Sequence, residues 1–200
     1  MGDFATNNDI LFRDDLPDVR NNAVLKYCFQ QFSFYADGYK IAADRLIKIC
    51  ISERELGRGD IDVLIYPIVF NYRHYIELRL KEIIIGLRYC SGHENVKFDS
   101  HNLKTLWDEL IILYDDFREE NDEEDFRNAE RLIHEFDKND PNSMSFRYPT
   151  DKKGNLISIE KINLNIRNFG EVMERLAFFL DSLSDVTENY KSLTDDTHEF

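Results

Sequence analysis

The longest helix-forming stretch of the chain, from Asp62 to Tyr89, reads DVLIYPIVFNYRHYIELRLKEIIIGLRY. Its apolar residues recur every three or four positions, as they do on one face of an α-helix. The members of this apolar stripe are Val69, Tyr72, Ile76, Leu80, Ile83 and Leu87. Beside it runs a row of alternating charge, in which Arg73, Glu77 and Lys81 are each four residues apart. Because these charges make the stretch too polar to span a bilayer, it predicts a long helix at the centre of a soluble domain.

Periodic apolar stripes predict four further helices. The first is expected to start at Asp18 and the third at Ser100, since both residues are good N-caps. Gly38, inside the first helix, predicts a close helix contact or a kink. The last helix has apolar residues spaced alternately four and three apart, as in a packing seam that serves either the domain's own core or a dimer. The five predicted ranges are 18–50, 62–89, 100–117, 121–139 and 162–183.

Between the last two predicted helices, residues 146–149 (FRYP) and 156–159 (LISI) flank a polar turn. This pattern predicts a small β-hairpin. The expected fold is therefore all-α, a helical bundle of about five helices with two long central helices and one small β-hairpin. We expect a flexible arm over residues 1–17, a single helical domain over 18–184 and an acidic tail over 185–200.

Composition restricts the class of protein. The chain has 25 basic and 39 acidic residues and a net charge of −14, which opposes non-specific attraction to nucleic acid or anionic lipid. Any contact with RNA must therefore depend on a local site. Cys28, Cys50 and Cys90 are widely spaced in apolar surroundings, which favours buried thiols in a reducing compartment. Because the N-terminal residues do not have the pattern of a signal peptide, we expect a cytoplasmic protein without membrane contact, metal or cofactor.

The strongest candidate chemistry lies on the fourth predicted helix. Arg127 and His134 are two helical turns apart, so they share a face, with Arg131 between them. Positive neighbours favour the neutral imidazole, which can act as a general base, and arginines stabilise a phosphate as it is attacked. Metal-free RNA cleavage needs this combination. The alternative is a solvated helix face whose arginines pair with nearby glutamates.

Other polar groups are weaker candidates. The row formed by Arg73, His74, Glu77 and Lys81 is either an internally paired helix flank or an ionic cluster lining a groove. Arg147, between aromatic residues of the predicted hairpin, is either an edge-strand charge or a clamp for phosphate or carboxylate.

Three more histidines are weaker candidates for catalysis. His93, close to Arg88, follows a predicted helix end, where the macrodipole alone favours basic residues. His101 is expected to help cap the third helix together with Asn102. His198 lies in the expected tail.

Two segments carry a family resemblance. Residues 66–81 (YPIVFNYRHYIELRLK), followed by residues 101–107 (HNLKTLW), resemble the HEPN superfamily, in which a helix with the pattern E..LK precedes a loop and then H(D/N)LK.L. The resemblance covers roughly Ile61 to Leu110, and residues 140–149 resemble an uncharacterised bacterial subgroup. It implies an all-α bundle that often dimerises. Many members are metal-independent RNases of toxin–antitoxin, abortive-infection and other antiphage systems.

The resemblance also implies site residues. The family's motif is Arg, a polar residue, and then His after four to six intervening residues, which Arg127, Asn128 and His134 match with six. It implies His134 as general base or acid, Arg127 as phosphate stabiliser and Asn128 as orienting group, with two copies of the motif meeting across a dimer. The product would be a 2′,3′-cyclic phosphate end. The residues expected to hold the substrate are Arg131, Arg147, Arg73 and Lys81.

The leading hypothesis is therefore a HEPN-like metal-independent endoribonuclease of a bacterial antiphage or toxin–antitoxin system. It would be a homodimer that acts on RNA and meets a cognate antitoxin or defence-system protein. The alternative is a non-catalytic HEPN-like helical module that binds a protein partner or a nucleotide, which the acidic balance favours. Arg167 and Asn168 open the last helix as the motif does, but no His follows at the allowed spacings. If that were the motif helix, the protein would be inactive as a nuclease.

Overall fold

The computed structural model describes residues 4–5, 10–12, 16–25, 31–52, 58–92, 97–98, 100–117, 123–157, 159 and 163–198. The chain forms two units, Met1–Gln30 and Gln31–Phe200. In the first unit the described residues contain one 3-10 turn, η1 (Val19–Asn21), and most of their large apolar side chains are exposed. The second unit contains the five α-helices.

The predicted start of the first helix is wrong. Helix α1 spans Phe32–Ser52 instead of beginning at Asp18. Asp18 accepts hydrogen bonds from the side chain of Asn21 at 2.8 and 2.9 Å and precedes only η1, which ends at an extended Asn22. Asp and Asn readily form such local bonds in place of a helix. The predicted stripe member Cys28 lies outside the described residues.

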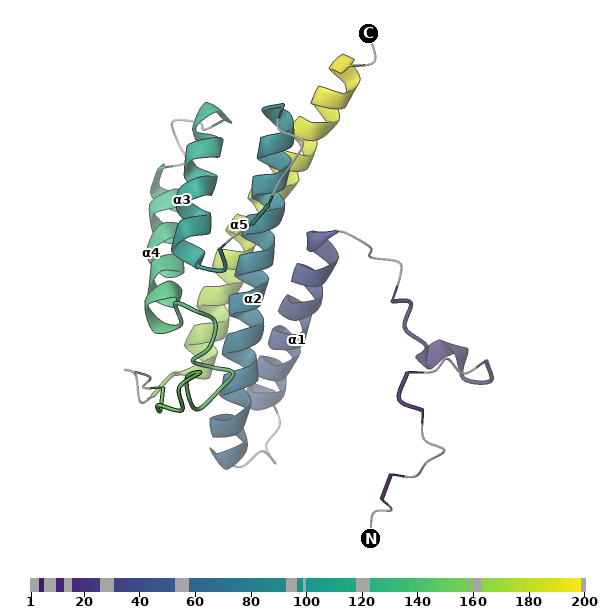
Figure 1. Cartoon of the computed structure of the whole chain (residues 1–200), viewed down its shortest axis with the longest axis vertical. Helices are drawn as coiled ribbons and strands as arrows, with labels where there is room; N and C mark the ends of the chain where they lie inside the picture. Colours follow the sequence, from purple (N-terminus) through teal and green to yellow (C-terminus); the bar gives the residue numbers. More distant parts are fainter. Residues whose placement is uncertain are drawn as a thin grey trace. The chain divides into compact units, whose positions relative to one another are not determined.

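Helix α2 (Arg58–Cys90) forms the centre of the bundle, as predicted. Helices α1, α3 (Leu103–Tyr114) and α5 (Ile166–His198) pack along it, and α4 (Glu123–Asn139) packs against α3 and α5 (Figure 1). Every member of the predicted apolar stripe is at most 3% exposed, which confirms its role in the core. A helix surrounded on several sides must also bury residues beside its stripe, and α2 does so with its charged row.

The ends of the other helices differ in detail from the prediction. Asn102, not Ser100, is the N-cap of α3, because its side chain accepts from Thr105 N at 2.8 Å. Helix α5 continues past Ser184 to His198, through the segment expected to be a tail. The described members of its predicted seam are used in the domain's own core, where Met173, Leu176, Leu180 and Leu183 are buried. Cys50 and Cys90 form no disulfide with any described residue.

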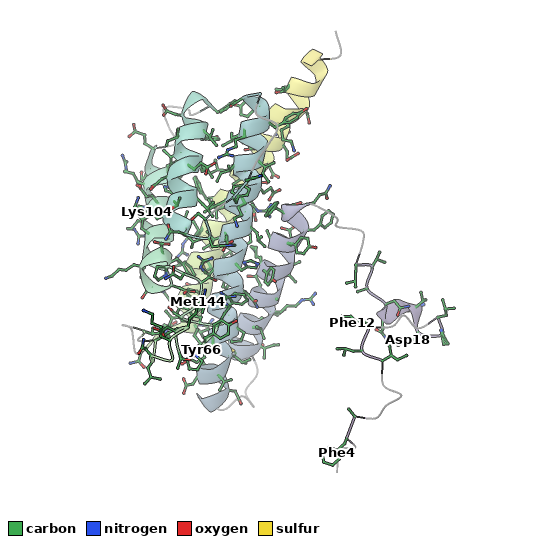
Figure 2. All side chains as sticks on the ribbon, viewed as in Figure 1. Phe4, Phe12, Asp18, Tyr66, Lys104 and Met144 are labelled. Carbon is green, nitrogen blue, oxygen red and sulfur yellow. The ribbon has the colours of Figure 1, made fainter. Side chains whose placement is uncertain are left out.

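The loop after α4 packs near the first half of α2. Tyr66 of α2 has its ring 6.4 Å from that of Phe146, and Met144 lies at the same end of the bundle (Figure 2). The predicted β-hairpin appears here as one antiparallel bridge between Thr150 and Leu156, closed by a turn in which Asp151 accepts two backbone hydrogen bonds. The parts of the chain that are described contain no strand, so the all-α class is confirmed. None of the described helices is both long and apolar enough to cross a membrane.

Candidate functional site

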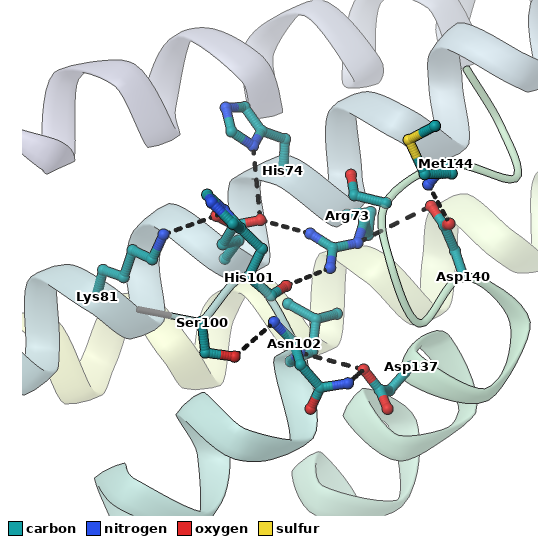
Figure 3. A network of polar contacts seen from close by, with 12 residues as sticks. Arg73, His74, Lys81, Ser100, His101, Asn102, Asp137, Asp140 and Met144 are labelled. Carbon is teal, nitrogen blue, oxygen red and sulfur yellow. Dashed lines mark hydrogen bonds and ion pairs between the residues drawn. The ribbon is translucent and has the colours of Figure 1, made fainter. Parts of the chain in front are cut away.

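The charged row of α2 is buried rather than solvated. Arg73, Glu77 and Lys81 are almost completely inaccessible, covered by the segment before α3 and by the loop after α4 (Figure 3). Charges removed from water are tolerated only when they are paired and hydrogen-bonded. We call these three residues, together with His74 and His101, the Glu77 cluster.

The carboxylate of Glu77 joins the members of the cluster. Its Oε2 accepts a hydrogen bond from Arg73 Nη1 at 2.6 Å, and its Oε1 accepts one from Lys81 Nζ at 2.8 Å. Burial by itself raises the pKa of this carboxyl. Hydrogen bonds from Lys81 and His101 and the charges of Lys81 and Arg73 outweigh burial, so the pKa lies below its ordinary value. Glu77 is therefore ionised at neutral pH.

Arg73 connects three segments of the chain. Besides Glu77, it donates from Nη2 to the backbone carbonyl of His101 at 2.5 Å, and its Nε lies 3.9 Å from Asp140 Oδ2. Asp140 is fully buried, and its Oδ1 accepts from the backbone N–H groups of Met144 and Ser145 at 2.7 and 2.9 Å (Figure 3). The arginine thus fixes the start of α3 and the loop after α4 against α2.

His101 combines exposure with a fixed orientation. Its side chain is 73% exposed, yet its Nδ1 lies 2.7 Å from Glu77 Oε1 and its carbonyl is held by Arg73. Because an ionised carboxylate can only accept, the shared hydrogen belongs to His101 Nδ1, and in the neutral form of the ring the lone pair is then on Nε2. Imidazoles oriented by a carboxylate in this way act as proton acceptors in catalysis.

The sequence led us to expect a capping role for His101, which Asn102 performs instead. His101 lies 24 residues from Glu77 in the chain. Helical spacing connects residues within one helix, so no spacing rule could pair Glu77 of α2 with a residue just before α3. The one sequence feature that linked Glu77 with His101 was the family resemblance, since both residues lie in the segments that carry it, 66–81 and 101–107.

His74 supplies a second imidazole on the same carboxylate. Its Nδ1 lies 4.0 Å from Glu77 Oε2, and its ring contacts Tyr39 edge-on at 4.4 Å and stacks on Phe70 at 5.7 Å between centroids. Burial lowers the pKa of His74; the charge of Glu77 opposes this, and three nearby cations lower the pKa again. The net shift is downward, so His74 is neutral at pH 7.

Arg147 reaches the surroundings of His74 from the loop after α4. Its guanidinium lies 5.4 Å from the ring centroid of Phe70 and 5.4 Å from that of Tyr148, and Nε donates to the carbonyl of Ser143. Its charge is among those that act on His74. Three of the four residues expected to hold the substrate, Arg73, Lys81 and Arg147, therefore lie around the two imidazoles.

The predicted catalytic residues of α4 have different surroundings. Arg127 is 66% exposed and pairs with Glu123 at 3.1 Å within its own helix. His134 lies two turns away, about 10 Å along the axis. Its Nε2 is buried and has no hydrogen-bond partner among the described residues. Within one chain, Arg127 and His134 share an edge of α4 but do not converge on a common point.

Asn128 and Arg131 of α4 have other surroundings. Together with α5 and the first turns of α2 they line a groove of about 1480 Å³, whose lining includes neither Arg127 nor His134. At 100° per residue, Asn128 lies about 100° around α4 from Arg127, whereas Arg131 lies only about 40° from it, between Asn128 and the edge that carries Arg127 and His134. Arg131 lies 4.0 Å from Glu135, and Phe178 of α5, also in the lining, is 77% exposed.

Fold and site together define an all-α bundle with a buried ionic cluster and an exposed histidine held by a carboxylate. No family model, curated protein or solved structure matches the chain. The described residues contain no group of three or more His, Cys, Asp or Glu side chains placed to bind a metal ion.

Proposed function

We propose that this chain is a HEPN-like metal-independent endoribonuclease of a bacterial antiphage or toxin–antitoxin system. The observation that carries the proposal is His101, an exposed imidazole whose Nδ1 is held by the buried, ionised carboxylate of Glu77. The resemblance adds support, because Glu77, Lys81 and His101 lie in the segments that carry it.

RNA cleavage of this kind needs a base, a stabiliser of negative charge and a proton for the leaving group. In the proposed reaction, His101 Nε2 removes the proton of the 2′-hydroxyl, and the 2′-oxygen forms a bond to phosphorus. The bond from phosphorus to the 5′-oxygen breaks, and that oxygen leaves with a proton from water, whose hydroxide takes the proton held by His101 and restores the base. Arg147, the exposed cation near His74, stabilises the phosphorane. The product is a 2′,3′-cyclic phosphate.

The residues proposed from sequence offer a second location for the same reaction. Arg127 is exposed, and its partner among the described residues is Glu123, in a surface ion pair that contributes little energy, so it is available to a second copy of the chain. In a homodimer, Arg127, Asn128 and His134 would be completed by their counterparts. This location requires that His134, whose Nε2 is buried, turn toward the interface.

Cleavage of single-stranded RNA by the purified chain tests both locations, with His134→Ala as the matched histidine control for His101→Ala. We expect His101→Ala to lose about 10²- to 10⁴-fold in rate, the usual contribution of a general base. We expect His134→Ala to keep its rate within a few-fold. A large loss in His134→Ala with little change in His101→Ala would place the reaction at α4. Equal cleavage by the wild type and by the variant that carries both substitutions would contradict the nuclease proposal.

A second function is favoured by the groove between α4 and α5. An open groove with a largely exposed aromatic side chain, Phe178, is typical of a site for a partner protein such as a cognate antitoxin or a defence-system protein. In that case the chain is a non-catalytic HEPN-like binding module. Loss of partner co-purification in Phe178→Ser, together with wild-type behaviour of His101→Ala, would support it.

A further inference from the structure

A hollow where α1 meets α2 adjoins the Glu77 cluster. It has a volume of about 300 Å³ and is lined by Phe34, Tyr35, Gly38, Tyr39, Ala42 and Asn71. Tyr35 is 55% exposed, and Phe34 is also exposed. The ring of Tyr39 both lines the hollow and contacts His74, so the hollow and the imidazoles share a wall.

Gly38 leaves the hollow open. A Cβ at this position would meet no atom within 4 Å, so the close helix contact expected from the sequence is not present. A glycine in the middle of an exposed helix costs about 0.5–1 kcal/mol relative to alanine. Neither a packing contact nor a positive φ explains Gly38. Its effect is to remove the side chain that would fill the space between Tyr35 and Tyr39.

The charged residues beyond Tyr39 have a small local excess of positive charge, in contrast to the acidic chain as a whole. Arg73, Lys81 and Arg147 contribute three cations, against the two buried carboxylates of Glu77 and Asp140. Of these cations only Arg147 is exposed, and its guanidinium lies over Phe70, whose ring stacks on His74. Aromatic rings interleaved with cations are the surface that single-stranded nucleic acids use, with bases stacked on rings and phosphates at guanidinium groups.

We propose that the hollow binds a base of single-stranded RNA, stacked against Tyr35 and Tyr39, while Arg147 binds a neighbouring phosphate. The amide of Asn71, on the wall of the hollow, offers both a donor and an acceptor to the edge of the base. This inference rests on the proposed nuclease function and names the substrate class and a subsite of the same face. It also explains how a chain of net charge −14 would bind RNA, by a local site and not by its overall field.

The test fills the hollow without removing any contact. Gly38→Leu places a side chain between the tyrosines, and Gly59→Leu is the matched control, because a Cβ at Gly59 in the first turn of α2 also meets open space. Leucine favours helix over glycine, so neither variant should lower the melting temperature. Binding is measured by the fluorescence anisotropy of a labelled single-stranded RNA of about 12 nucleotides, within the usual site sizes for single strands.

We expect Gly38→Leu and Tyr35→Ala each to weaken binding about 5- to 150-fold, the range for one stacked base, with Gly59→Leu unchanged. Arg147→Ala should weaken it as well and reduce its salt dependence. The inference is overturned if the wild type does not bind, if Gly38→Leu binds like the wild type, or if an RNA duplex competes as well as the single strand. Cleavage is scored separately. Cleavage that depends on His101 but not on Gly38→Leu would refute the hollow alone, whereas binding at the hollow without cleavage would refute the nuclease alone.

Discussion

Helices α2 and α4 carry similar patterns of charged residues in opposite environments. Both have a cation and a carboxylate four residues apart, and both include a histidine. On α2 the ion pair between Arg73 and Glu77 is buried and joined to His101 and Asp140, from other segments. On α4 the pair between Arg127 and Glu123 is open to water. Spacing along a helix therefore predicts which charges can pair, while the position of the helix in the bundle determines whether the pair is buried.

The largest expected difference between the two rows is in stability. Glu77→Gln leaves Arg73 and Lys81 buried without their carboxylate, which should cost on the order of 3–5 kcal/mol of unfolding free energy. Urea unfolding followed by circular dichroism measures this. The matched variant Glu123→Gln, at an exposed pair, should change the same quantity by less than about 1 kcal/mol. Similar losses in both variants would contradict the contrast.

A smaller effect is expected in the pH dependence of stability. The pKa of His74 in the folded chain lies below its ordinary 6.5, so the unfolded state binds more protons and stability falls as pH drops below 6.5. Glu77 has a folded pKa below 4.5, so its contribution is complete above pH 4.5 and is lost as pH falls through the folded value. His74→Phe, which keeps a ring against Phe70 and Tyr39, should flatten the curve below pH 6.5, and between pH 4.5 and 6.5 this effect is separate from that of Glu77. An unchanged slope in that window would mean that His74 is not the group responsible.

The smallest effect is expected on α4. Arg127→Ala removes a side chain that is 66% exposed and whose ion pair lies within its own helix, so stability should change by about 0.5 kcal/mol or less. A loss above about 2 kcal/mol would show that this edge of α4 makes contacts beyond the single chain. Repeating the measurement at several protein concentrations would then reveal a dimer, because the stability of a dimer rises with concentration.

Much of the fold followed from local pattern. The apolar stripe of α2 predicted the central helix and its buried residues, and the ranges 100–117 and 121–139 fall close to those of α3 and α4. The first helix was expected too early because apolar residues before Phe32 happen to continue its period. The hairpin was expected from two short apolar runs, but the described residues there contain one bridge, between Thr150 and Leu156, and no strand. Single-sequence patterns do not report whether a neighbouring element is present to bury a face or pair a strand.

The candidate site was predicted in pieces. Arg73 and Lys81 were singled out in one row with His74 and Glu77, as either an internally paired helix flank or an ionic cluster, and Arg147 was singled out separately, as either an edge-strand charge or a clamp. The sequence could not show that Arg147 joins this row, because the loop after α4 had to fold back onto α2 to bring Arg147 to Phe70. It also could not show that Asn128 and Arg131 would face a groove while Arg127 and His134 would not. That division depends on which side of α4 the rest of the bundle covers.

The sequence by itself determined the helical class, the central helix and the pairing partners along its charged row. These follow from interactions within a few residues, which the period of the helix makes visible. Only the tertiary structure decided that this row is buried, that His101 is held by Glu77 and that a hollow opens beside His74. These features arise where segments far apart in the chain meet, and the burial that drives them together depends on the whole bundle.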